Sequence, residues 1–181
     1  MNKFPWWLIA LGAAAIMVTG GGYFFVTNRQ TGNRWTRLLP DTRAKAQQLI
    51  DQARAAGLDV MFWDGWRPPE ASAENMRAGT SKIKSPFDSL HVWGVAFDIV
   101  FVNTAGFPTW LEDASKPASW VDPRWKKLAA IGQQLGLYSG GLNWGWDWPH
   151  FQMPGYAAST LRARYGNDYL AFLTQRGVAV A

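Results

Sequence analysis

The sequence predicts an α+β domain with a small mixed, mainly antiparallel sheet and flanking helices, preceded by one N-terminal transmembrane helix. Short strand patterns and helical patterns are interspersed without the regular βαβ alternation of a doubly wound sheet. No charge occurs in Trp6–Val26, a mostly apolar run that as a helix would span roughly 30 Å, the thickness of a bilayer core. We therefore divide the chain into a signal anchor (1–27), a linker (28–40) and one domain (41–181).

The N-terminal segment has the features of an uncleaved signal anchor. Lys3 and the amino terminus form a small positive region before the apolar run, and no clear small-x-small cleavage site follows it. Three arginines after the run favour the opposite topology under the positive-inside rule, namely Arg29, Arg34 and Arg37. A short N-terminal tail is nevertheless easily left in the cytoplasm, so we expect a membrane anchor with the domain outside.

The first half of the domain contains a helix, a strand and a second helix. Asp41 follows Pro40 as a candidate helix cap, apolar residues then recur at helical spacing, and Gly57 ends the run. Leu58–Trp63 is a short apolar stretch that predicts a strand, which Asp64-Gly65 would end. Glu70–Arg77 is expected to form a short helix.

The second half alternates in the same irregular way. Phe97–Val102 is apolar and β-branched, which predicts a buried strand. Apolar residues near Pro123–Leu135 share one helical face. A glycine-rich stretch then leads to a strand over His150–Met153. The tail from Tyr156 onward is expected to be helical, in two pieces separated at Gly166-Asn167.

Composition excludes several classes of site. The chain of 181 residues is 48% hydrophobic, enough for a real core, and has no cysteine. Thiolate zinc sites, disulfides and a cysteine nucleophile are therefore excluded. The net charge of +5 could draw the protein to polyanions, or it could be ordinary surface variation. Because the basic residues are scattered, with no arginine-rich run or base-reading motif, we expect no nucleic-acid partner.

The chain has only two histidines, His91 and His150, and each lies in a motif with a carboxylate. The motifs are SLHVWGVAFD over residues 89–98 and DWPHFQ over residues 147–152. Imidazole and carboxylate are the usual ligands of a catalytic zinc ion, which keeps its fourth position open. A lone histidine is commonly just a buried, hydrogen-bonded residue, but two matched motifs favour His91, Asp98 and His150 as metal ligands. Gly94 would allow the turn that brings the first two together.

Two further side chains are candidates for chemistry. Asp147, three residues before His150, could act as a general base, as an additional ligand or as a partner that orients His150. We favour the base, because hydrolysis needs a proton acceptor. Arg67 follows the Asp64-Gly65 turn and could clamp a substrate carboxylate or stabilise an oxyanion, although most arginines are solvated surface residues.

The pattern Ser-x-His-x-x-Gly-x-Ala-x-Asp followed by Asp-x-x-His resembles the zinc peptidases of bacteria and phages that cut peptidoglycan stem peptides. These are D-alanyl-D-alanine carboxypeptidases, VanY-type enzymes and L-alanyl-D-glutamate endopeptidase endolysins. The similarity covers about Leu49–Met153. The resemblance implies Zn²⁺ on His91, Asp98 and His150, with Asp147 as catalytic base, Arg67 as the substrate or oxyanion arginine, and Ser89 in substrate binding.

The resemblance also implies a substrate and a location. The expected partner is a peptidoglycan stem peptide, and the expected location is the cell-wall side of the bacterial inner membrane, in a bacterial or phage-encoded enzyme. Pro68 and Ser72 stand where such enzymes often carry Ser or Thr and then Gln, which leaves the cleaved bond open. The alternatives are a non-catalytic wall-binding module on the same fold and a zinc hydrolase of an unrelated amide or ester.

Overall fold

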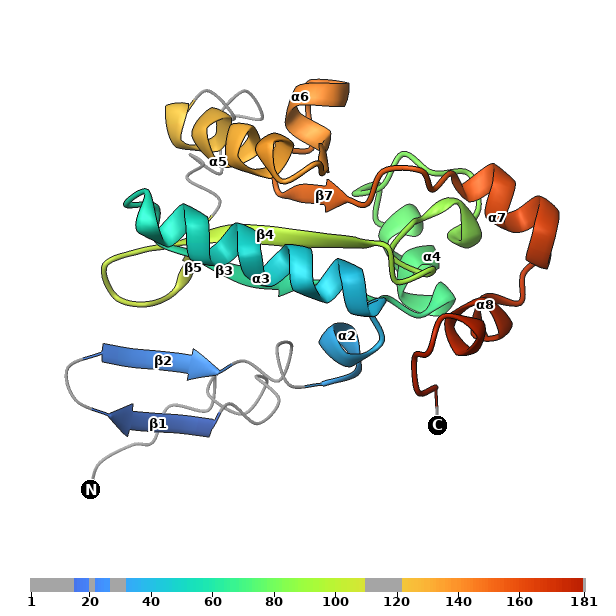
Figure 1. The fold of residues 1–181 in the computed structure, drawn as a ribbon, viewed down its shortest axis with the longest axis horizontal. Helices are drawn as coiled ribbons and strands as arrows, with labels where there is room; N and C mark the ends of the chain where they lie inside the picture. The colour runs from blue at the N-terminus through green and yellow to red at the C-terminus, as the bar shows by residue number, and fades with distance from the viewer. Residues whose placement is uncertain (1–14, 20–21, 27–31, 110–121, 181) are drawn as a thin grey trace.

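The computed structural model describes residues 15–19, 22–26, 32–109 and 122–180 (Figure 1). Its main sheet has the strand order β3-β4-β7-β6, with the short β5 also paired to β4. These strands are β3 (Val60–Asp64), β4 (Ala96–Val102), β5 (Pro108–Thr109), β6 (Tyr138–Ser139) and β7 (His150–Gln152). Every pairing among them is antiparallel. The predicted α+β class with a mainly antiparallel sheet is therefore confirmed.

Two helices cover one face of the sheet. α3 (Pro40–Ala55) buries the side chains whose helical spacing the sequence shows, among them Leu49 and Ile50, and α5 (Pro123–Gln134) buries Trp125 and Leu128. These residues share one core with alternate residues of β3, β4 and β7: Val60, Phe62, Phe97, Ile99, Phe101 and Phe151. Because side chains alternate along a strand, Asp98 points to the other face.

The second core lies at one end of the sheet, near the C-terminus (Figure 1). It joins the turn over residues 89–95 to α7 (Ala158–Tyr165) and α8 (Tyr169–Gln175). Trp93 is fully buried there and packs edge-on against Phe172, with ring centroids 5.6 Å apart. This packing holds the first histidine motif in place. The split of the C-terminal helices is as the sequence predicts.

Gly94 lies in this turn, as expected, and has a second role there. Its φ is +67°, a left-handed conformation that favours glycine. A Cβ built on Gly94 would lie 2.5 Å from the backbone oxygen of Arg37. The close approach that requires a glycine is therefore to the chain before α3.

The helix expected over Trp6–Val26 is wrong for the part of that run that the structure describes. β1 (Ala15–Thr19) and β2 (Gly22–Val26) form an antiparallel pair instead, and residues 6–14 lie outside the described residues. The physical reason is composition: β-branched and aromatic residues favour strands, and each glycine in a helix costs about 1 kcal/mol. Among the described residues, no helix combines the length and apolar character needed to cross a bilayer.

The expected linker, residues 28–40, also differs from the structure where it is described. α2 (Asn33–Thr36) is a short helix, and Pro40 is the first residue of α3. Leu38 and Leu39 are buried, and the Trp35 ring packs edge-on against Phe62 at 4.8 Å. The sequence does not predict this burial, because residues 33–40 are too few to show a helical or strand periodicity. Residues 33–40 therefore belong to the folded domain.

Candidate metal centre

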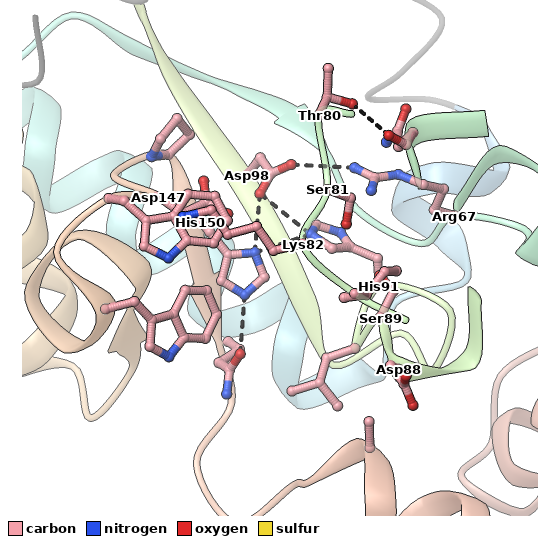
Figure 2. A pocket seen from close by; sticks show the side chains of 18 of the residues that line it. Arg67, Thr80, Ser81, Lys82, Asp88, Ser89, His91, Asp98, Asp147 and His150 are labelled. Carbon is pink, nitrogen blue, oxygen red and sulfur yellow. Dashed lines mark hydrogen bonds and ion pairs between the residues drawn. The ribbon is translucent and has the colours of Figure 1, made fainter. Parts of the chain in front are cut away.

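A cleft of about 960 Å³ lies on the face of the sheet opposite α3 and contains all the predicted site residues. Figure 2 shows Asp98, His91 and His150 at its centre, with Arg67 on one side and Asp147 on the other. The strand register explains part of this convergence, since Asp98 of β4 lies directly opposite His150 of β7. Residues paired in this way project from the same face of a sheet with their Cβ atoms about 5 Å apart.

His91 comes from the turn between the short 3-10 helix Pro86–Asp88 and β4. Its Nδ1 lies 2.7 Å from the backbone oxygen of Gly65. A carbonyl oxygen only accepts hydrogen bonds, so Nδ1 carries the proton and donates it. In the neutral ring, Nε2 is then left with a lone pair that points into the cleft.

His150 presents its other nitrogen. Its Nε2 lies 3.1 Å from Oε1 of Gln152, so Nε2 donates to the amide oxygen and Nδ1 keeps a lone pair. This partner lies two residues further along the chain, in β7. Hydrogen bonds of this kind are what orients imidazole ligands in metal sites.

Three electron-pair donors thus meet at one point. His91 Nε2 lies 3.1 Å from His150 Nδ1, and Oδ1 of Asp98 lies 3.4 Å from each of them. Lone pairs at these distances repel one another unless a cation lies between them. Ligands placed tetrahedrally about 2.1 Å from a zinc ion would be about 3.4 Å apart, so the spacing fits such an ion. His91, Asp98 and His150 form a group able to hold a metal ion.

The second oxygen of Asp98 faces Arg67. The distance between Asp98 Oδ2 and Arg67 Nη2 is 3.5 Å, so the carboxylate lies between the imidazoles and the guanidinium. Burial alone would raise the pKa of Asp98, but the neighbouring histidines hold it well below its usual range. Burial also disfavours the charged form of Arg67, yet the charges of Asp98 and Asp64 raise the pKa of Arg67. Both groups are therefore charged as they face each other.

Asp147 and Ser89 line the same cleft. Burial and then the like charge of Asp98 raise the pKa of the Asp147 carboxyl. Burial disfavours the charged form of His150, but the neighbouring carboxylate of Asp98 raises the pKa of that imidazole. A carboxyl with a raised pKa holds a proton more readily, which suits the predicted base.

Asp64 is a site residue that the sequence analysis missed. It is only 6% exposed, and its Oδ2 accepts from Arg67 at 3.1 Å (Nε) and 2.8 Å (Nη2). Its Oδ1 accepts from the backbone N–H of Gly65 and from Arg34. Asp64 therefore fixes the guanidinium of Arg67 and anchors Gly65, the partner of His91. From the sequence we interpreted Asp64 only as the end of a strand. The residues next to it in the chain contain no pattern that predicts a buried carboxylate.

Replacing Asp64 by alanine should destabilise the domain by about 2–4 kcal/mol, because the mostly buried guanidinium of Arg67 loses both of its hydrogen bonds to Asp64 and keeps only Asp98, 3.5 Å away. Urea denaturation measures this change. Asp88→Ala is the matched control, since it removes the more exposed ion pair with Arg162 and should cost less than about 1 kcal/mol. Equal decreases in the free energy of unfolding for the two variants would show that the buried ion pairs of Asp64 contribute no more to stability than the exposed pair does.

Tryptophans form one wall of the cleft. Trp144, in α6 (Gly140–Trp144), is 47% exposed, and its ring lies 5.0 Å from that of His150 and 6.1 Å from that of Trp146. Trp66, Trp93 and Trp148, by contrast, are buried. The wall therefore offers exposed aromatic surface immediately beside the second histidine.

The comparisons with known proteins agree with the motif resemblance. No family model matches the chain. The L-alanyl-D-glutamate peptidase of Listeria phage A118 is 28% identical over 135 residues, which cover 68% of this chain. The match covers 41% of that relative, so the chain spans less than half of its length.

A solved structure shows the fold. The Serratia marcescens L-Ala D-Glu endopeptidase ChiX superposes with a TM-score of 0.51 and 21% identity, covering 69% of this chain and 86% of that one. The resemblance to this group of peptidases is therefore confirmed in both sequence and fold.

Proposed function

We propose that this chain is a zinc-dependent peptidase that hydrolyses an amide bond in peptidoglycan stem peptides. One observation carries the proposal. Two imidazole lone pairs and a carboxylate oxygen, 3.1–3.4 Å apart, meet in a cleft that also contains Asp147 and Arg67. An open cleft beside such a centre leaves room for a substrate and for the fourth position of a catalytic metal.

In this proposal, His91 Nε2, His150 Nδ1 and Asp98 Oδ1 hold the zinc ion. Bound zinc would polarise the scissile carbonyl and make water a better nucleophile at neutral pH. Gly65 and Gln152 keep the two rings in the required tautomers through their hydrogen bonds.

Asp147 is the proposed general base. Its carboxylate would take the proton of the attacking water and then pass it to the nitrogen of the leaving amine. The lining of the cleft supports this role, since Asp98, the other acidic side chain beside the histidines, is held between them and Arg67.

Arg67 has two proposed roles. Its Nη2 faces the outer oxygen of Asp98 and so helps to orient that ligand. Because its side chain also lines the cleft, the guanidinium can donate to an oxygen of the substrate as negative charge develops there. Ser89, buried beside His91, is proposed to contact the substrate.

We propose the L-Ala–D-Glu bond as the bond that is cut. The support is the sequence relative, which is named as an L-alanyl-D-glutamate peptidase. Under this proposal the chain acts as an endopeptidase, one of the two kinds of action that the histidine motifs leave open.

Digestion of purified peptidoglycan tests the function and the bond together. The full-length protein loaded with zinc should release fragments whose new amino termini are D-glutamate, identified by mass spectrometry. Asp51→Asn, an exposed change on α3, should digest the wall as the parent does. New D-alanine termini would indicate carboxypeptidase action, while binding to the wall without any cleavage would indicate a wall-binding module.

We further propose that the domain acts on the cell-wall side of the bacterial inner membrane and that the uncharged segment Trp6–Val26 directs it there. The proposed substrate lies on that side. A C-terminal alkaline phosphatase fusion should therefore be active in intact cells. An inactive phosphatase with an active cytoplasmic reporter would mean that Arg29, Arg34 and Arg37 keep the domain inside.

A further inference from the structure

Lys82 and Arg67 are the lysine and arginine side chains that line the cleft, and they differ in their acidic partners. The acidic residues Asp88 and Asp98 each have a basic partner, Arg162 at 2.7 Å and Arg67 at 3.5 Å. Arg67 is further engaged by Asp64. Within residues 32–109 and 122–180, Lys82 forms no ion pair with a carboxylate, although its side chain lines the same cleft (Figure 2).

An aromatic ring holds this ammonium group in place. Lys82 Nζ lies 4.1 Å from the ring centroid of Trp146, a cation–π contact. The contact joins two walls of the cleft, because Lys82 follows α4 (Pro69–Arg77) in the chain whereas Trp146 follows α6. A lysine side chain has high rotamer entropy, and this contact restricts it near the cleft.

The same ring connects Lys82 with the candidate metal centre. Trp146 stacks against Trp144, with centroids 6.1 Å apart, and Trp144 lies 5.0 Å from the ring of His150. The ammonium group therefore stands at the end of a row of rings that begins at a predicted ligand. A substrate bound along this row would therefore meet a positive charge on the same wall of the cleft as His150.

We propose that Lys82 is a specificity residue that binds a free carboxylate of the substrate, and that Trp146 positions it. The inference rests on the proposed function and names the carboxylate. In the L-Ala–D-Glu segment the glutamate is linked through its side chain, so its α-carboxylate is free and adjoins the scissile nitrogen. The ammonium group of Lys82, which has no acidic partner among the described residues, can donate a charge-assisted hydrogen bond to that carboxylate.

Two synthetic peptides isolate this carboxylate. Both contain L-Ala-γ-D-Glu-L-Lys and end in a carboxamide, but the glutamate α-carboxyl is free in one and amidated in the other. The zinc-loaded parent should prefer the free carboxylate by about tenfold in kcat/KM, mainly through KM, because amidation removes the charge that strengthens a hydrogen bond from the ammonium group. Lys82→Met should abolish the preference, and Lys82→Arg should keep it.

Two further comparisons separate positioning from bulk charge. Trp146→Leu should weaken the preference, whereas Trp146→Phe should retain most of it, because phenylalanine keeps an aromatic face. Lys84→Met removes an exposed lysine two residues away that does not line the cleft, so it should leave the preference intact. An equal loss for both peptides in Lys82→Met, or an unchanged preference, would overturn the proposal.

Calorimetry provides a readout that does not need turnover. The product peptides beginning with D-glutamate or its α-amide should bind the parent with about tenfold different Kd, and Lys82→Met should remove that difference. If the parent cleaves neither substrate peptide, the proposed function fails, and the calorimetric comparison still decides whether Lys82 binds the carboxylate. Equal Kd values for both products in the parent would then refute the role of Lys82.

Discussion

His91→Ala and His150→Ala are expected to lose the zinc ion and, with it, the proposed peptidase activity. Each substitution removes one of three nitrogen and oxygen donors that lie 3.1–3.4 Å apart. Structural zinc sites with four protein ligands bind the ion with about 10–16 kcal/mol in total, or about 3 kcal/mol per ligand, so affinity should fall by at least about a hundredfold. Metal analysis of the purified full-length protein should give close to one zinc per parent chain and almost none per variant.

The fold must be checked in the same proteins, because both histidines are buried. Circular dichroism and urea denaturation measure whether the variants are folded and how stable they are. Asp51→Asn, purified in the same way, serves as the control. A His91→Ala protein that contains no metal and still digests the wall at the parental rate would refute the metal assignment.

Asp147→Asn and Asp98→Asn should separate the base from the ligand. Both changes keep the shape of the side chain and remove its charge. Asp147→Asn should keep zinc near the parental level, lose roughly two to four orders of magnitude in kcat, and change substrate affinity little. Asp98→Asn should lose metal, because a neutral amide is a much poorer ligand than a carboxylate. Metal analysis and steady-state kinetics on the same preparations measure both effects.

The opposite pattern has a clear meaning. If Asp147→Asn loses zinc while Asp98→Asn retains it, the roles of the two carboxylates are exchanged. If neither variant loses activity, hydrolysis does not use a carboxylate base in this cleft, and the proposed mechanism fails.

Local pattern was sufficient for much of the fold. The helical spacing before Gly57 predicted α3, the apolar run Phe97–Val102 predicted β4, and Gly166-Asn167 marked the break between α7 and α8. Such features depend on periodicity and on turn residues within one segment, so sequence alone expresses them. Local pattern gave the wrong element for Trp6–Val26. Its apolar content favoured a helix, but the part that the structure describes forms strands, which β-branched and aromatic residues favour.

The sequence by itself determined the types of donor at the site: two histidines, each in a motif with a carboxylate. Only the tertiary structure decided which ring nitrogens face the cleft, since Gly65 and Gln152 select the tautomers. It alone brought Arg34 to Asp64 and Lys82 to Trp146. The physical reason is that hydrogen bonds, ion pairs and cation–π contacts depend on distance in space, and residues from separate segments become neighbours only when the chain folds.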